Sequence, residues 1–170
     1  QIMSVVYFVI QQTMYFAIPL LIVAIGAMYS ERSGVINIAM EGIMVMGAFV
    51  GIFFINIFQD RMSGQKLLLL AILIVAVAGG LFSLLHAFAS INMKADQTIS
   101  GTALNLFAPA FAIFTARMIQ GVQQIQFTDT FHIDKVPVLG DIPVIGDMFF
   151  QNCYITTYIG IGIFLVAAYV

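Results

Sequence analysis

Charged residues are scarce in this chain, and their scarcity excludes several classes of protein. Of the 170 residues, 8% are charged (six Lys or Arg and eight Asp or Glu), whereas 62% are hydrophobic. Soluble domains average about 25% charged and about 45–50% apolar residues, so the apolar excess is larger than a buried core requires. The sequence has no basic cluster, which argues against nucleic acid as a partner. The composition therefore predicts a protein of the lipid bilayer.

Cysteine and the common catalytic motifs are also lacking. The one cysteine, Cys153, cannot form an intrachain disulfide and is interpreted as a small apolar filler at the start of a segment. The sequence has no GxxxxGK[ST] loop and no GxSxG, HExxH or CxxC motif. The Asp and His residues between positions 129 and 147 match no known pattern of metal ligands. We therefore expect no catalysis, no metal and no cofactor in this chain.

Apolar segments separated by short polar stretches predict an all-α fold, a polytopic membrane helical bundle in one domain that covers the whole chain. Residues 2–10 are interpreted as the tail of a truncated or interfacial segment, because Gln11 and Gln12 follow, although one long tilted helix would cover both blocks. Pro19 is expected to bend its helix. The chain starts at Gln1 and ends inside an apolar run, so we expect an N-terminal fragment of a longer polypeptide. The expected spans are residues 13–29, 37–58, 67–91, 98–118 and 153–170.

Polar residues enter an apolar segment in the stretch from Ser30 to Gly51. Asn37 and Glu41 are four residues apart and therefore share one face of a helix. A carboxylate inside an apolar span is costly and by default marks a functional site, here part of a solute path. The alternative is that Glu41 lies near a helix end and reaches interfacial water.

A second polar face is expected on the segment 98–118. Thr98, Thr102 and Asn105 recur at i, i+4 and i+7, which places them on one face. Pro109 leaves the Asn105 carbonyl without its usual donor, and this combination is typical of a broken helix that lines a solute path. The alternative is that the hydroxyls bond back to their own helix. The predicted pathway residues are Asn37, Glu41, Thr98, Thr102 and Asn105.

Small residues predict where helices approach one another. Gly47 and Gly51 form a small-xxx-small pair, and Gly79, Ser83 and His86 recur at helical spacing as a second packing face. His86 is interpreted as a hydrogen-bonded structural histidine, with a proton relay or a ligand as the alternative.

Residues 121–152 form the one long stretch that is not expected to span the membrane. PVLGDI and PVIGD repeat Pro and Gly-Asp at a period of six, which predicts two successive turns in a rigid loop. We interpret this loop as a docking surface or an extracellular plug.

Three blocks of sequence resemble a known family of membrane proteins. They are ERSGVINIAMEG followed by GAFVG, KADQTISGTALNLFA, and VPVLGDIPVIGDMFFQNCY. Over most of residues 13–160 the chain resembles the permease subunits of bacterial ABC importers for nucleosides and simple sugars. These subunits belong to the larger group of ribose and branched-chain amino acid permeases.

The resemblance implies a multi-pass transport subunit of the bacterial inner membrane that is not itself an enzyme. It implies a second permease subunit, a cytoplasmic ATP-binding subunit that hydrolyses ATP, and an extracellular or lipid-anchored substrate-binding protein. It places residues 121–152 outside and residues 30–36 and 92–97 inside, with the segment that couples to the ATPase expected beyond Val170. This orientation conflicts with the positive-inside rule by one residue. The loops placed outside carry three Lys or Arg, and those placed inside carry two.

Three alternatives differ from this interpretation in solute, energy source or role. A branched-chain amino acid permease would use Glu41 for the ammonium group, with Arg117 as the candidate for the carboxylate. A proton-coupled secondary carrier would use Glu41 and His86. A structural or assembly subunit would have no solute path at all.

Overall fold

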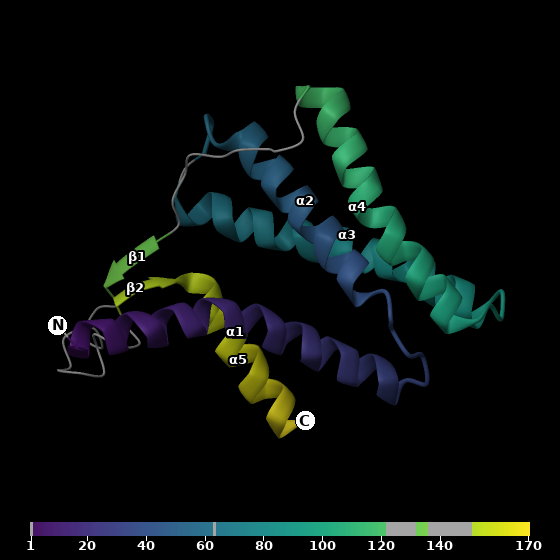
Figure 1. Ribbon diagram of the computed structural model, residues 1–170, viewed down its shortest axis with the longest axis horizontal. Coiled ribbons are helices and arrows are strands. Elements are labelled where there is room, and N and C mark those ends of the chain that lie inside the picture. The colour runs from purple at the N-terminus through teal and green to yellow at the C-terminus, as the bar shows by residue number, and fades with distance from the viewer. Residues whose placement is uncertain (1, 63, 122–131, 136–150) are drawn as a thin grey trace. The chain divides into compact units, whose positions relative to one another are not determined.

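The computed structural model describes residues 2–62, 64–121, 132–135 and 151–170 (Figure 1). The all-α prediction is confirmed, and the one exception in these ranges is a pair of short strands. The helices are α1 (Ile2–Arg32), α2 (Met40–Phe58), α3 (Gln65–Ile91), α4 (Gln97–Gln120) and α5 (Ile155–Tyr169), and the strands are β1 (His132–Lys135) and β2 (Gln151–Tyr154).

Four of the described helices, α1 to α4, are long and apolar enough to cross a membrane, and α5 is apolar but shorter, with 15 residues. Their exposed side chains are largely aliphatic or aromatic. On α3, for example, Leu73, Leu81 and Leu84 are each about 60% exposed. An apolar surface of this kind suits lipid or neighbouring membrane helices, as the composition predicts.

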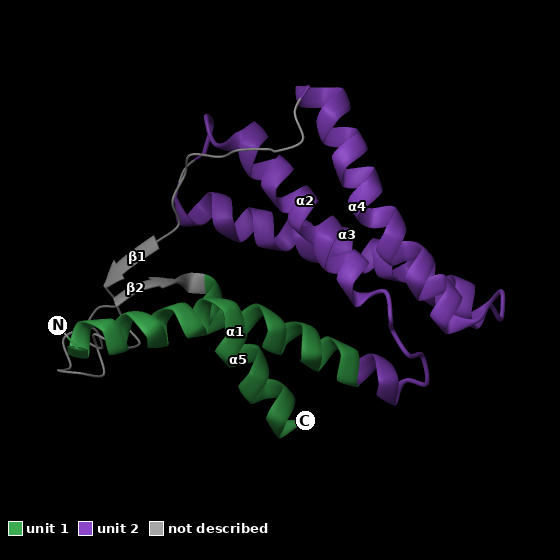
Figure 2. Cartoon of the chain, in the orientation of Figure 1, with its two compact units in different colours: residues 1–28, 131–170 green, residues 29–130 purple. Residues whose placement is uncertain are grey.

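The chain divides into two compact units, which Figure 2 colours separately. The unit formed by Tyr29–Thr130 contains α2, α3 and α4, and α2 contacts both of the other helices. Gly47 and Gly51 bring α2 close to α3, since a Cβ on either glycine would lie 3.2 or 2.8 Å from a methyl group of Val75. A central cluster in the core of this unit takes one buried residue from each helix, namely Met46, Phe82 and Ala108.

The other unit contains most of α1 together with α5 and the two strands. α1 continues without interruption through Gln11, Gln12 and Pro19, so the predicted separate tail at residues 2–10 is wrong and a single long helix takes its place. Gly160 of α5 is buried, and a Cβ at this position would collide with the side chain of Ile18. β1 and β2 pair antiparallel, with Ile133 opposite Cys153.

Two helix starts differ informatively from the predicted spans, and one predicted break is missing. α2 begins at Met40 rather than at residue 37, because the chain before it is not helical. α5 begins at Ile155, because Cys153 belongs to β2. α4 runs continuously through Pro109, so the described backbone of this segment does not break there. The Pro and Gly-Asp repeats predicted to form turns lie outside the described residues.

Candidate functional site

The polar residues of the chain converge on the connection between α1 and α2. We call this connection the corner and define it as residues 33–39. After α1 ends at Arg32, the chain turns through Ser33 and Gly34, with a φ of +88° at Gly34, and stays non-helical until Met40. Non-helical backbone exposes N–H and C=O groups, which at membrane depth require partners within the protein or in a water-filled cavity. Four of the corner's backbone groups find partners among side chains of α3 and α4.

Gln97 of α4 contacts the corner at two points. Its Oε1 accepts from the backbone N–H of Ile36 at 2.8 Å, and its Nε2 donates to the carbonyl of Gly34 at 3.5 Å. The Gln97 side chain therefore bonds to one N–H and one C=O of the corner, neither of which has a partner within a helix. Ser30 supplies another bond from within the chain's own turn, since its hydroxyl donates to the carbonyl of Val35 at 2.7 Å.

His86 of α3 lies under the corner and is 1% exposed. Its Nε2 is 3.2 Å from the carbonyl oxygen of Ile36, and its Nδ1 is 3.1 Å from the hydroxyl of Ser100. A carbonyl oxygen only accepts, so Nε2 carries a proton, and in the neutral ring the Ser100 hydroxyl donates to Nδ1. His86 thus joins α3, α4 and the corner through both ring nitrogens.

Asn105 of α4 bridges the end of the corner and the start of α2. Its Nδ2 donates to the carbonyl of Ile38 at 2.9 Å, and its Oδ1 accepts from the backbone N–H of Gly42 at 2.7 Å. The Asn37 side chain acts locally, because its Oδ1 accepts from the N–H of Ala39 at 3.1 Å. Both predicted asparagines therefore bond to backbone groups of the corner and of the first turn of α2.

Glycines allow α4 to approach the corner and α2 very closely. A Cβ at Gly42 would lie 2.7 Å from the carbonyl oxygen of Leu104, and a Cβ at Gly101 would lie 2.8 Å from the Cβ of Ile38. The atoms met at these two positions are backbone or the first atom of a side chain, so neither can move aside by a change of rotamer. The interface between α2 and α4 is therefore fixed at nearly the minimum possible separation.

The remaining pathway residues lie on exposed positions beside this interface. Thr98 and Thr102 are exposed on α4, and the Thr102 hydroxyl donates to the carbonyl of Thr98 at 2.8 Å, as in the alternative of bonding back to the helix. Glu41 is exposed in the first turn of α2. Among the described residues, no hydrogen bond or ion pair to its carboxylate is present.

The residues predicted to pack helices lie mainly between α2 and α3. Gly47 and Gly51 are buried against Val75, and a Cβ at Gly79 would meet the side chain of Ile43 at 3.7 Å. Ser83 is half-buried on α3, one turn from the buried His86. In the described part of the chain, no group of three His, Cys, Asp or Glu residues is arranged to hold a metal ion.

Gln97 and Ser100 were not selected by the sequence reasoning, although both bond to the corner or to its histidine. The face of α4 that meets the corner carries Gln97, Gly101 and Asn105, at i, i+4 and i+8. The predicted face carries Thr98 and Thr102, each of which directly follows a residue of the observed face. The two faces are therefore about 100° apart around the helix. In the sequence, Gln97 resembles an ordinary interfacial residue at the start of a helix. The one signal of this face is that Gly101 lies midway between two amide side chains, Gln97 and Asn105.

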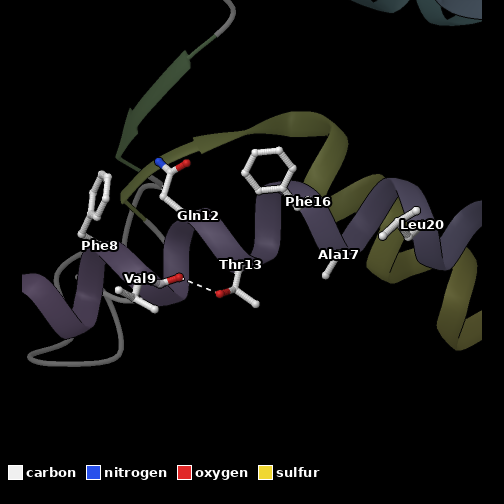
Figure 3. A pocket seen from close by; sticks show the side chains of 7 residues that line it. All are labelled: Phe8, Val9, Gln12, Thr13, Phe16, Ala17 and Leu20. Carbon is white, nitrogen blue, oxygen red and sulfur yellow. Dashed lines mark hydrogen bonds between the residues drawn. The ribbon is translucent and has the colours of Figure 1, made fainter.

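Two other features involve residues outside the corner. A series of phenylalanine rings crosses the three helices, with centroid separations of 6.4 Å (Phe82 to Phe107), 5.5 Å (Phe107 to Phe111) and 6.5 Å (Phe111 to Phe49). A shallow pocket of about 490 Å³ lies along α1 (Figure 3). Its lining is mainly apolar and includes none of the predicted pathway residues; it consists of Phe8, Val9, Gln12, Thr13, Phe16, Ala17 and Leu20.

Comparison with known proteins gives one matching family. The profile described as "Branched-chain amino acid transport system / permease component" matches residues 9–169. No solved structure matches the chain significantly.

Individual relatives match over nearly the whole chain. The guanosine ABC transporter permease protein NupQ of Bacillus subtilis is 38% identical over 170 residues, which are 99% of this chain and 53% of the relative. The nucleoside ABC transporter permease protein NupC of Lactococcus lactis is 36% identical over 169 residues, with the same two coverages. The putative glucose ABC transporter permease protein TsgC13 of Haloferax volcanii is 29% identical over 150 residues, 82% of this chain and 40% of that protein. The chain thus spans about half the length of NupQ and of NupC.

Proposed function

This chain belongs to the family of branched-chain amino acid transport system permease components, and from that premise we propose that it forms part of the membrane path of an ATP-driven nucleoside importer. The observation that carries the proposal is that the two relatives matching nearly the whole chain are both named for nucleoside transport. The four long apolar helices support a location in the bacterial cytoplasmic membrane.

The partners follow from the class of transporter. We propose that the chain works with a second permease subunit, a cytoplasmic ATP-binding subunit and an extracellular or lipid-anchored substrate-binding protein. Energy then comes from ATP bound and hydrolysed in the partner, which fits a chain without a phosphate-binding loop. Movement of the helices opens the path to one side of the membrane and then to the other.

Within this chain we place the solute path along the exposed polar side chains beside the α2–α4 interface. Glu41 offers a carboxylate that accepts hydrogen bonds, and Thr98 and Thr102 offer hydroxyl groups, all at the end of the unit where α2 and α4 begin. Ribose hydroxyls and base N–H groups are suitable donors to such acceptors. Binding along the path is expected to be weak, since a solute must leave as readily as it enters.

Two other solutes have specific support. The family description names branched-chain amino acids, and one relative is named as a putative glucose permease. An amino acid path needs a cationic group for the carboxylate as well as Glu41 for the ammonium. Arg117 is the candidate that the sequence offers for this role, but it lies 12 residues beyond Asn105 on α4, about 18 Å along the helix, so it cannot bind the same amino acid molecule as Glu41.

The experiment is an uptake assay in cells that lack their own nucleoside uptake and carry the complete transporter with its partner subunits. Radiolabelled guanosine, glucose and leucine are compared, with and without a protonophore under conditions that preserve ATP. We expect guanosine to accumulate and the protonophore to leave its uptake unchanged. Accumulation of leucine or glucose alone would assign a different solute, and arrest by the protonophore would indicate a proton-coupled carrier.

A further inference from the structure

The start of α2 lacks the capping side chain that most buried helix starts have. The first four N–H groups of a helix have no partner within the helix, and a Ser, Thr, Asp or Asn at the N-cap usually accepts from one of them. At α2 the N-cap is Ala39, which has no polar side chain and is 0% exposed. α4 shows the usual arrangement, since Asp96 accepts from the N–H groups of Thr98 and Ile99 at 2.8 and 3.1 Å.

Water does not replace the missing cap at this position. Gly42, whose N–H is the third after the N-cap, is buried against the backbone of α4. α3 also begins without a capping side chain, but its N-cap, Gly64, is exposed and open to solvent. The start of α2 therefore needs an acceptor from another part of the protein.

Asn105 supplies this acceptor from the neighbouring helix. Its Oδ1 takes the Gly42 N–H at 2.7 Å, which is the bond that an N-cap side chain ordinarily makes to the third residue. Its Nδ2 at the same time holds the carbonyl of Ile38, just before the N-cap, at 2.9 Å. One amide thus fixes the backbone on both sides of the first helical turn.

Glu41 lies in the turn that this amide fixes. It directly precedes Gly42, and it is exposed whereas Gly42 is buried. The close contact of Gly42 with Leu104 leaves α2 no room to slide or rotate against α4 without breaking the bond to Asn105. The position of the Glu41 backbone therefore depends on an amide that belongs to another helix.

We propose that Asn105 is a positioning residue that caps α2 from α4 and thereby holds Glu41 in its place on the solute path. This inference depends on the proposed function for the role of Glu41, but not for the cap itself. Asn105 acts on transport through the first turn of α2 rather than by contact with the solute.

The cap is tested by hydrogen–deuterium exchange on the complete, detergent-purified transporter, read from peptides that cover residues 38–46. We expect Asn105→Ala to speed exchange there by about 5- to 30-fold, the factor that one or two kcal/mol of lost hydrogen bonding produces. Asn105→Asp keeps an oxygen that accepts from Gly42 but loses the N–H that donates to the Ile38 carbonyl, so its exchange rate should lie between those of wild type and Asn105→Ala. Thr115→Val, ten residues further along α4, is the matched control and should leave these peptides unchanged.

Positioning through Glu41 is tested by a double-mutant cycle on uptake. Glu41→Asp keeps the carboxylate but withdraws it by one methylene, so uptake is expected to fall without being lost. If Asn105 acts through Glu41, the two losses will not multiply, and Asn105→Ala will reduce uptake much less in the Glu41→Asp background. A role in stability alone predicts that the two losses multiply.

The two experiments can separately overturn the cap and its action through Glu41. Unchanged exchange at residues 38–46 in Asn105→Ala overturns the cap, and multiplying losses overturn the action through Glu41. A changed preference among competing nucleosides in Asn105→Ala, with unchanged exchange, would mean that Asn105 contacts the solute directly. If the wild-type transporter moves no nucleoside, the proposed function fails. The exchange measurement still shows whether Asn105 caps α2, and the double-mutant cycle is then run with the solute that is transported.

Discussion

Gly42→Ala tests the closest helix contact in the chain. The new Cβ would lie 2.7 Å from the carbonyl oxygen of Leu104 and 3.0 Å from the Oδ1 of Asn105. Ordinary contact begins at 3.4 Å, so α2 and α4 must separate by about 0.7 Å at this point. The obstacle is backbone, which has no alternative rotamer, and the substitution should therefore displace the helices rather than a side chain.

The size of the effect follows from three contributions. Overpacking of a tight site costs about 1–3 kcal/mol. Separation of the helices also weakens the bond between Gly42 and Asn105, at a cost of about 1 kcal/mol. The better helix propensity of alanine returns about 1 kcal/mol. We expect a net loss of about 1–3 kcal/mol.

The assay is the apparent melting temperature of the detergent-purified transporter, followed by the loss of the monodisperse peak after heating. Gly80→Ala on α3 is the matched control, because no heavy atom lies within 4 Å of its Cβ position. That change should stabilise α3 by about 0.5–1 kcal/mol. If Gly42→Ala melts at or above the temperature of Gly80→Ala, α2 and α4 are not in backbone contact and the account of the corner is wrong.

The remaining predictions concern His86, Glu41 and two residues with positive φ, Gly34 and Lys94. His86→Leu should lower stability by about 1–3 kcal/mol in the same melting assay, because it removes two hydrogen bonds, to the Ile36 carbonyl and to the Ser100 hydroxyl; a melting point equal to wild type would contradict this. Glu41→Gln should reduce guanosine uptake by about 10- to 100-fold at unchanged membrane abundance on immunoblots, and undiminished uptake would remove Glu41 from the path. Gly34→Ala should destabilise by about 1–2 kcal/mol from its φ of +88° alone, since its Cβ would meet nothing within 4 Å. Lys94→Gly, at a φ of +51°, should instead raise the melting temperature, and a fall would show that its side chain matters more than its backbone.

The long helices are predictable from the sequence because each apolar run reaches the roughly 17–25 residues that a bilayer requires. The contact of Gly47 and Gly51 with α3 is likewise signalled locally, since two small residues one turn apart leave a groove on a helix. Both features depend only on the length of one apolar segment or on the interval between two of its residues, and both can be read from the sequence.

The start of α2 is not predictable in the same way. Asn37 and Ile38 lie in an apolar run that favours a helix, and the local sequence contains no Gly or Pro between Gly34 and Met40 to end it. What stabilises the non-helical backbone is a set of side chains on α3 and α4, including His86 and Asn105. Tertiary hydrogen bonds therefore override local propensity at the corner. The sequence marks Asn105 as polar, but only the fold shows that its partners are backbone groups.

The corner also has a consequence for biosynthesis. Ile36 bonds to side chains that follow it by 50 and 61 residues, and Ile38 bonds to one that follows by 67. A ribosome adding about 5–20 residues per second needs roughly 3–12 s to make 60 residues. During that interval the nascent corner has to remain hydrated at the membrane surface or within the translocation machinery. Final docking of this turn is thus a late event in membrane insertion, completed only after the fourth helix has been delivered.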